Sequence, residues 1–503
     1  MSTVSSLALR PARSASVPAF VTVALTWVAV LFFLWPGKNS LPAGAVSSAS
    51  FFLAQLLFPN CRFSFRHLVS PLNWMLCVFA LQLVVMPAAV RIAGPSSFVL
   101  PALPSPFAIN FALMISTVAF WSFCVSVQIF RRRGPARGHR PARAQDWIPG
   151  RKLPLLFAVL GCVGMALRFG SLERLGQYIT DPAIYMGFAL EAAEKPATLA
   201  GATGTFLTPF LGFAFVLLLC RSIDLPVKEH ERGRWLGRVV LIALTAAAYS
   251  TMTYNRGSFA VPMVAIATVI GKRMPRAALR YLLATGLVFG LLVSAVTFYR
   301  EAPQKDSLSV TEAAGLIEFG GIFQEYGQAP QRLGYFLERN HFAEEPLLGR
   351  TVICSVLSPV PVLGKGFRDC SGGVVYNATL QRLGADQIFQ AEGELFLDFH
   401  IFGVVFGFVL LGWAVAKIQL RFELTSAAAE VYVLVFATVW LGFLTVGSID
   451  VLAQIAIYSC PPIYLYLWVR ARQRRQNNPG RRRLLLDAAG PERGVSSPAS
   501  DTL

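Results

Sequence analysis

The sequence predicts an all-α membrane protein, a polytopic transmembrane helical bundle of about twelve spans with one large extracytoplasmic loop. Three observations predict this fold class. The 503-residue chain has a mean hydropathy of +0.55 and is 55% hydrophobic but only 14% charged, which is typical of membrane proteins rather than soluble domains. Apolar runs of about 17 to 22 residues recur, and each can cross about 30 Å of hydrocarbon as a helix. One long polar block, residues 300–395, separates the last three runs from the others.

The chain divides into five parts. Residues 1–16 form a polar N-terminus, 17–299 hold nine spans with a lesser loop at 170–199, 300–395 form the large loop, 396–469 hold three more spans, and 470–503 form a basic tail with the composition of a disordered segment. The first span is longer than the apolar core of a cleaved signal peptide, so we interpret it as a retained anchor. The expected spans are 17–35, 41–58, 72–90, 107–130, 153–169, 200–220, 239–254, 258–271, 281–298, 399–416, 430–446 and 451–469.

The net charge of +18 is explained by topology. With the N-terminus in the cytoplasm, the cytoplasmic segments hold 31 of the 45 Lys and Arg residues and, counting Glu430 at the boundary of its span, 9 of the 27 acids. Basic clusters fall at every second loop, as the positive-inside rule requires. The excess charge therefore faces an anionic membrane leaflet, and no nucleic-acid partner is needed to explain it. Both termini are expected in the cytoplasm.

The large loop combines expected helices with an irregular stretch. Ser309 to Glu312 have capping-box spacing, which predicts a helix from about Val310. Residues 330–342 predict a second helix that begins at Pro330, and the Pro- and Gly-rich stretch 357–375 predicts irregular backbone. Cys354 and Cys370 share this loop, and an oxidising compartment would permit a disulfide worth about 3 kcal/mol. The sequence leaves both the bonded and the free state open. The other six cysteines lie in or beside spans and are expected to be apolar fillers.

Charged residues gather at the expected outer ends of the spans, and no predicted span has one near its middle. Several arginines there need an explanation, because basic residues are disfavoured on the outer side. One interpretation is contact with lipid phosphates or pairing with loop acids. The other is a shared site for a phosphorylated lipid, since guanidinium groups bind phosphate oxygens bidentately. The candidates are Arg168, Arg256, Arg300, Arg339, Arg350 and Arg368, and Glu392, Glu394 and Asp398 lead into the tenth span.

His341 is the one histidine of the expected outward loops, beside Arg339, Glu344 and Glu345. Imidazole suits a general base at neutral pH, although a single histidine is more often structural. The histidines are dispersed and show no metal-ligand spacing, and no phosphate-binding glycine loop or nucleophile elbow is present. The sequence therefore predicts neither a metal nor another cofactor.

Two short stretches, together with the layout, resemble the O-antigen polymerase (Wzy-type) or oligosaccharide repeat-unit polymerase family. Tyr254-Asn255-Arg256-Gly257-Ser258 before an apolar run looks like the family's "R-G/S" hairpin. Residues 393–403 (GELFLDFHIFG) look like its "E-x-x-x-N-F-G" entry to the span after the large loop. Asp398 stands where the family often has Asn, and extra residues separate it from the glycine. The loops at 170–199 and 300–395 correspond to the family's two large periplasmic loops.

The resemblance implies a GT-C-like, metal-independent glycosyltransferase in the bacterial inner membrane. Such an enzyme would transfer a growing glycan (O-antigen, capsule or exopolysaccharide) from polyprenyl pyrophosphate to a hydroxyl of a new lipid-linked repeat unit. Its expected partners are polyprenyl-pyrophosphate-linked oligosaccharide, membrane lipid, a flippase and a chain-length regulator. The six arginines would stabilise the leaving pyrophosphate, and His341 or Glu394 would serve as the base.

Other functions remain open from the sequence. A ligase that moves finished polymer onto an acceptor would use the same arginines and loop. A non-catalytic exporter of lipid-linked glycan is disfavoured by the uncharged spans, because it would be expected to line a central cavity with cations. A sensor or scaffold in envelope assembly is disfavoured only by the outward arginines.

Overall fold

The described part of the chain is mainly helical. The computed structural model describes residues 19–35, 40–64, 69–95, 103–132, 149–171, 173–176, 199–224, 256–273, 330–360, 363–372 and 390–476, and no strand occurs among them. The α-helices are α1 (Ala19–Leu34), α2 (Pro42–Leu57), α3 (Pro71–Ala80), α4 (Met86–Ala93), α5 (Pro106–Arg132), α6 (Lys152–Phe169), α9 (Leu199–Leu207), α10 (Pro209–Asp224), α12 (Arg256–Arg273), α16 (Pro330–Arg339), α17 (Arg350–Leu357), α19 (Ala391–Leu424), α20 (Ala428–Phe443), α21 (Ile449–Tyr458) and α22 (Pro461–Gln476).

Five helical stretches are long and apolar enough to cross a membrane: Pro71–Ala93, Pro106–Arg131, Lys152–Phe169, Ala200–Asp224 and Ala391–Leu424. A sixth span results if the helix pair Ile449–Tyr458 and Pro461–Gln473, which is bent by 57°, is counted as one span. Three apolar helices are shorter: Phe20–Leu34, Pro42–Leu57 and Ala428–Phe443. These helices identify the chain as a helical membrane protein. The expected spans at 239–254 and 281–298, and the expected helix near Val310, lie outside the described residues.

Proline sets several helix boundaries. α2, α3, α5, α16 and α22 begin at a proline, where the missing N–H costs nothing and the fixed φ suits the first turn. A proline also marks the break between α9 and α10 and that between α21 and α22. The apolar runs expected at 200–220 and 451–469 are therefore each divided into two helices.

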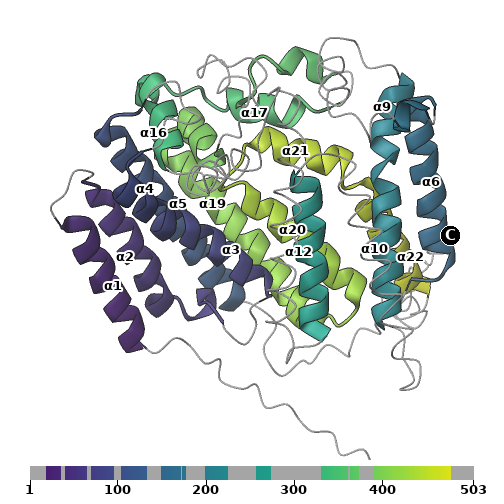
Figure 1. Ribbon diagram of the computed structural model, residues 1–503, viewed down its shortest axis with the longest axis horizontal. Helices are drawn as coiled ribbons and strands as arrows, with labels where there is room; N and C mark the ends of the chain where they lie inside the picture. Colours follow the sequence, from purple (N-terminus) through teal and green to yellow (C-terminus); the bar gives the residue numbers. More distant parts are fainter. Residues whose placement is uncertain are drawn as a thin grey trace, which may run out of the picture.

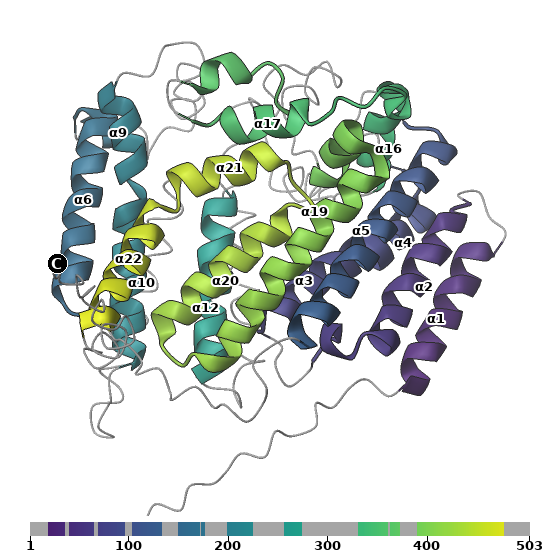
Figure 2. The ribbon, with the colours of Figure 1, turned by 180° about the vertical axis from the view of Figure 1, so that it is seen from behind.

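The bundle has two groups of helices with α12 and α20 between them (Figures 1 and 2). In one group α19 packs along α5, and aromatic rings of α2, α3, α5 and α19 form its core, among them Phe79, Phe120 and Phe408. In the other, α6 and α10 pack together and contribute to a second core with α12, α20 and α22. The loop helices α16 and α17 lie together across one end of the bundle (Figure 1).

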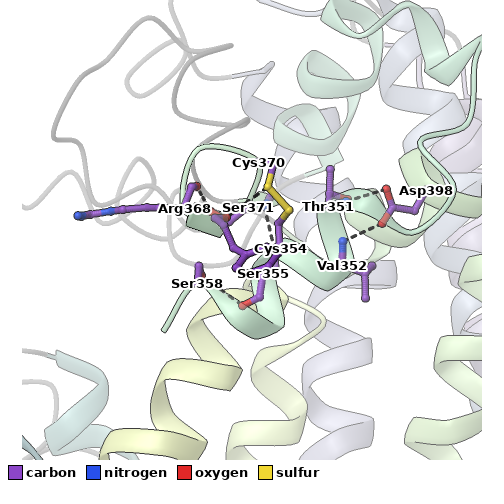
Figure 3. Close-up of a disulfide and its surroundings, with 11 residues drawn as sticks. Thr351, Val352, Cys354, Ser355, Ser358, Arg368, Cys370, Ser371 and Asp398 are labelled. Carbon is purple, nitrogen blue, oxygen red and sulfur yellow. Dashed lines mark hydrogen bonds between the residues drawn. A yellow bond between two sulfur atoms is a disulfide. The ribbon is translucent and has the colours of Figure 1, made fainter. Parts of the chain in front are cut away.

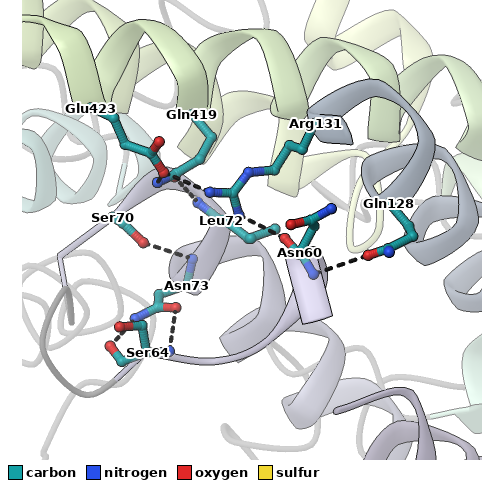
Figure 4. A network of polar contacts seen from close by, with 9 residues as sticks. All are labelled: Asn60, Ser64, Ser70, Leu72, Asn73, Gln128, Arg131, Gln419 and Glu423. Atoms are coloured by element: carbon teal, nitrogen blue, oxygen red, sulfur yellow. Dashed lines mark hydrogen bonds and ion pairs between the residues drawn. The ribbon is translucent and has the colours of Figure 1, made fainter. Parts of the chain in front are cut away.

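The opposite end of the bundle carries a polar network (Figure 4). Arg131 at the end of α5 forms an ion pair with Glu423 of α19 at 2.7 Å and donates to the Asn60 carbonyl at 2.6 Å. Gln128 accepts from the Asn60 N–H at 2.9 Å, and Gln419 accepts from the first turn of α3. We call this end, which also receives Lys272 of α12, the inner end. The network satisfies helix-terminal backbone groups that would otherwise lack partners.

Candidate functional site

The first turns of α19 fold back against the rest of that helix. His400 interrupts it with φ 52° and ψ −147°, and a Cβ on Gly403 would lie 2.3 Å from the carbonyl oxygen of Leu395. In a straight helix, residues eight apart are separated by about 12 Å along the axis. The chain therefore turns sharply at His400, and Gly403 permits the contact because it has no side chain. We call Ala391–Phe399 the acidic segment. The sequence predicted one span at 399–416 and did not anticipate this turn.

Backbone strain is concentrated around the acidic segment. The non-glycine residues with positive φ in the described chain are His341, Phe342, Leu348 and His400. Leu347 and Leu348 donate backbone hydrogen bonds to the carbonyls of Leu397 and Asp398, both at 3.0 Å. Such conformations cost about 1–3 kcal/mol each and gather at functional sites. Their position therefore indicates that this end of the bundle holds the functional site.

Glu394 is fully buried where three elements meet. The N–H of Ile449, at the start of α21, lies 3.3 and 3.4 Å from its two carboxylate oxygens. A Cβ on Gly372 would lie 2.1 Å from Oε1 of Glu394, so the loop backbone closes directly over the carboxylate. Gly372 in turn donates its N–H to the hydroxyl of Ser355 at 2.8 Å. The acid that the sequence singled out is thus present as a covered group.

Asp398 is also fully buried and accepts hydrogen bonds from the first turn of α17 (Figure 3). The backbone N–H groups of Thr351 and Val352 donate to its two oxygens at 3.2 and 2.7 Å. A carboxylate at a helix N-terminus satisfies orphan donors and interacts favourably with the helix dipole. Asp398 therefore fixes α17 onto the acidic segment.

A disulfide joins Cys354 of α17 to Cys370, the pairing that the sequence left open (Figure 3). It ties the turn at residues 363–372 to α17, and Asp398 ties α17 to the acidic segment. The turn, α17 and the segment therefore form one connected cover around Glu394. Arg368, on the same turn, extends away from Asp398 (Figure 3).

The remaining candidates lie on the surface or outside the described residues. Arg339 ends α16, and its guanidinium lies 5.4 Å from the centroid of the Tyr335 ring. His341 follows α16 in a 3₁₀ turn, and Arg350 begins α17. The side chains of Arg339, His341, Arg350 and Arg368 are all exposed. Arg168 lies in the last turn of α6 and is also exposed. Figures 1 and 2 place α6 and α16 at opposite sides of the bundle, so the structure does not bring Arg168 together with Arg339 of α16.

Arg256 is the first residue of α12, whereas the sequence predicted that it lies in a hairpin before the helix. The side chain of Arg256 and the whole of Arg300 lie outside the described residues. Lys272, in the last turn of α12, lies at the inner end, which places the start of α12 toward the loop helices. Sequence reasoning missed Glu392 as a site residue. Its carboxylate accepts a hydrogen bond from the hydroxyl of Ser116 on α5 and is fully buried. No feature of the sequence indicated that the chain would turn and carry this acid into the bundle.

The fold and the site define a helical membrane protein whose acidic segment is enclosed under a disulfide-tied cover. Among the residues that the structure describes, no group of three or more His, Cys, Asp and Glu side chains is arranged to hold a metal ion. No family model matches the chain, and neither the curated proteins nor the solved structures include a match to it.

Proposed function

We propose that the chain polymerises lipid-linked oligosaccharide repeat units at the outer face of the bacterial inner membrane. The observation that carries the proposal is the fold of residues 393–403. The stretch that resembles the polymerase family forms most of the acidic segment and its turn, and it places Glu394 and Asp398 under the loop helices. This is where a glycosyltransferase acting on a lipid-linked substrate would need its acids.

The chemistry of this reaction uses groups of this kind. The bond between the donor sugar and pyrophosphate breaks, a bond forms between that sugar and the acceptor oxygen, and polyprenyl pyrophosphate leaves. Glu394 or His341 accepts the proton of the acceptor hydroxyl. Arg339, Arg350 and Arg368 are exposed at the loop end, where guanidinium groups stabilise the charge that develops on the leaving phosphate. Glu394 requires movement of its cover before it meets a substrate.

The orientation with both termini in the cytoplasm is part of the same proposal. The inner end carries basic clusters such as Arg131, Lys272 and Arg421, in keeping with a cytoplasmic position. The loop end carries the Cys354–Cys370 disulfide, which an oxidising compartment favours. A count of twelve spans follows if the expected spans outside the described residues also cross the membrane.

The first experiment is a gel of surface glycan from a strain that lacks the gene. A polymerase predicts a change from a ladder to a single repeat unit on its acceptor. Loss of all attached glycan, with long polymer remaining on the lipid carrier, would instead identify a ligase. An unchanged ladder would refute both, and a lipid-linked repeat unit retained at the cytoplasmic face would indicate an exporter.

Complementation with Glu394→Gln tests the site itself. This variant should give the single repeat unit while remaining in the membrane at normal amount. Glu345→Gln is the matched control, because Glu345 is an exposed acid of the same loop, and it should restore the ladder. A normal ladder from Glu394→Gln would exclude Glu394 as the base and leave His341 to be tested in the same way.

A further inference from the structure

Glu392 is a buried acid that the proposed reaction does not use. It lies on the opposite face of the acidic segment from Glu394, and its Oε2 accepts a hydrogen bond from the hydroxyl of Ser116. Its side chain is 0% exposed, and within the described part of the chain its Oε1 is buried with no hydrogen-bond partner. A buried polar atom without a partner is uncommon and calls for a physical explanation.

Glu392 lies well inside the bundle. Ser116 is ten residues from the start of α5 at Pro106 and sixteen from its end at Arg132, so it lies about 15 Å from the outer end of α5 and about 24 Å from the inner end along the helix axis. It also falls within the candidate membrane span Pro106–Arg131. The turn at His400 therefore carries a carboxyl group into the part of the bundle that the sequence predicted to be free of charge. Ionisable groups at such depth often mark proton sites.

The contacts of Glu392 suit a proton better than other cations. An ionised carboxylate in an apolar interior needs a counter-charge or several donors, and Glu392 has one serine hydroxyl. Metal ions take four or more ligands, whereas a proton needs a single oxygen. In the neutral form Oε2 still accepts from Ser116, and Oε1 carries the proton.

Charged and titratable groups on the surrounding elements do not neutralise Glu392. Its hydrogen-bond partner in the described chain is Ser116, and the segment's own acids Glu394 and Asp398 are engaged with α21 and α17. The charged and titratable groups on α5 and α20 lie toward the inner end of the bundle. The charged and titratable groups on the elements packed against α19 are Arg332, Tyr335, Glu338 and Arg339 on α16, His341 on the following 3₁₀ turn, Arg350 on α17, Asp450 and Tyr458 on α21, Cys77 on α3, Cys124, Arg131 and Arg132 on α5, and Glu430 and Tyr432 on α20.

We propose that Glu392 is a proton-binding site within the bundle, and that the bound proton holds the acidic segment against α5. Loss of the proton leaves an uncompensated charge beside Ser116 and favours movement of the segment away from α5. The same movement would carry Glu394 and Asp398 with it, because all three acids share one short helical segment. The proton site itself does not depend on the proposed glycan chemistry.

The test compares the full chain and its Glu392→Gln variant, purified into lipid nanodiscs, by thermal unfolding from about pH 4, below the usual pKa of glutamate, to about pH 8.5. Glutamine is a neutral isostere of protonated glutamate. If the folded chain binds a proton that the unfolded chain releases, wild-type stability falls as pH rises, whereas that of the variant does not. The two should have similar Tm at low pH, with a gap on the order of several degrees at high pH. Glu345→Gln should follow the wild type throughout.

A second measurement uses chemical modification read by mass spectrometry. Dicyclohexylcarbodiimide, an apolar reagent for protonated carboxyl groups, should modify Glu392 more at low pH, and a water-soluble carbodiimide should not. Parallel pH profiles for wild type and Glu392→Gln would overturn the proposal, as would failure of the variant to fold. Neither measurement reads glycan synthesis, so failure here and failure of the proposed function are distinguishable.

Discussion

Gly372 offers the sharpest test of how Glu394 is enclosed. A Cβ at this position would lie 2.1 Å from Oε1 and 2.3 Å from Cδ of Glu394, well inside van der Waals contact. The carboxylate is fully buried beside the N–H of Ile449, so it cannot move aside into solvent. Inserting a methyl group into such a packed site costs about 1–3 kcal/mol. Gly372→Ala should therefore destabilise the protein by this amount and impair polymer synthesis.

Gly366 provides the matched control in the same turn, because a Cβ there would meet nothing within 4 Å. Gly366→Ala should change stability by no more than about 0.5 kcal/mol. Unfolding by SDS in mixed micelles measures both variants. Glu394→Ala removes the atoms that the new methyl group would strike, so Gly372→Ala in that background should cost little. The cycle should then show a coupling of about 1–3 kcal/mol. An equal cost for Gly372→Ala in both backgrounds would refute the described enclosure.

Three further predictions concern other parts of the structure. Replacing Cys354 and Cys370 together by serine should lower the free energy of unfolding by about 3 kcal/mol on the chain-entropy estimate. In the wild type without reductant, neither cysteine should react with a thiol reagent, and labelling of both would contradict the disulfide. Arg256→Ala should abolish polymer on a glycan gel while the protein remains in the membrane, and a normal ladder would exclude Arg256 from the site. Gly403→Leu should prevent the turn before the last spans and lower the yield of folded protein. Gly150→Leu should not, because a Cβ at position 150 would meet nothing within 4 Å and the residue is exposed.

The sequence predicted the class of fold because hydropathy reports directly on burial in lipid. The runs at 107–130 and 153–169 correspond within a few residues to α5 and α6, and Pro330 begins α16 as its position suggested. The turn at His400 could not be predicted in this way. An apolar run shows that a helix can form, but it does not show where the helix reverses, and the contact between Gly403 and Leu395 depends on packing between distant parts of the chain.

The candidate site shows the same limit. Glu394 and Cys354 were recognisable because acids and cysteines beside an expected span are chemically distinctive. Their partners were not, since a backbone N–H of α21 and a glycine of the large loop carry no chemical mark in the sequence. Exposure also differs from what residue type suggested, because Arg168, Arg339, Arg350 and Arg368 are exposed on separate elements, while the acids of the acidic segment are enclosed.

The buried carboxyl group of Glu392 is hard to explain as an element of stability alone, because its partner in the described chain is a single serine hydroxyl. Burying an acid without a counter-charge costs free energy, and even paired buried charges can often be replaced by apolar residues at a net gain. A segment that only linked the loop to a span would be more stable with an apolar side chain at position 392. It would also not require the strained conformation of His400, which costs about 1–3 kcal/mol. The bundle nevertheless holds all these features in one nine-residue segment, each acid against a different helix. Because these costs fall together at the loop end, they support the proposal that the protein performs its chemistry at the acidic segment.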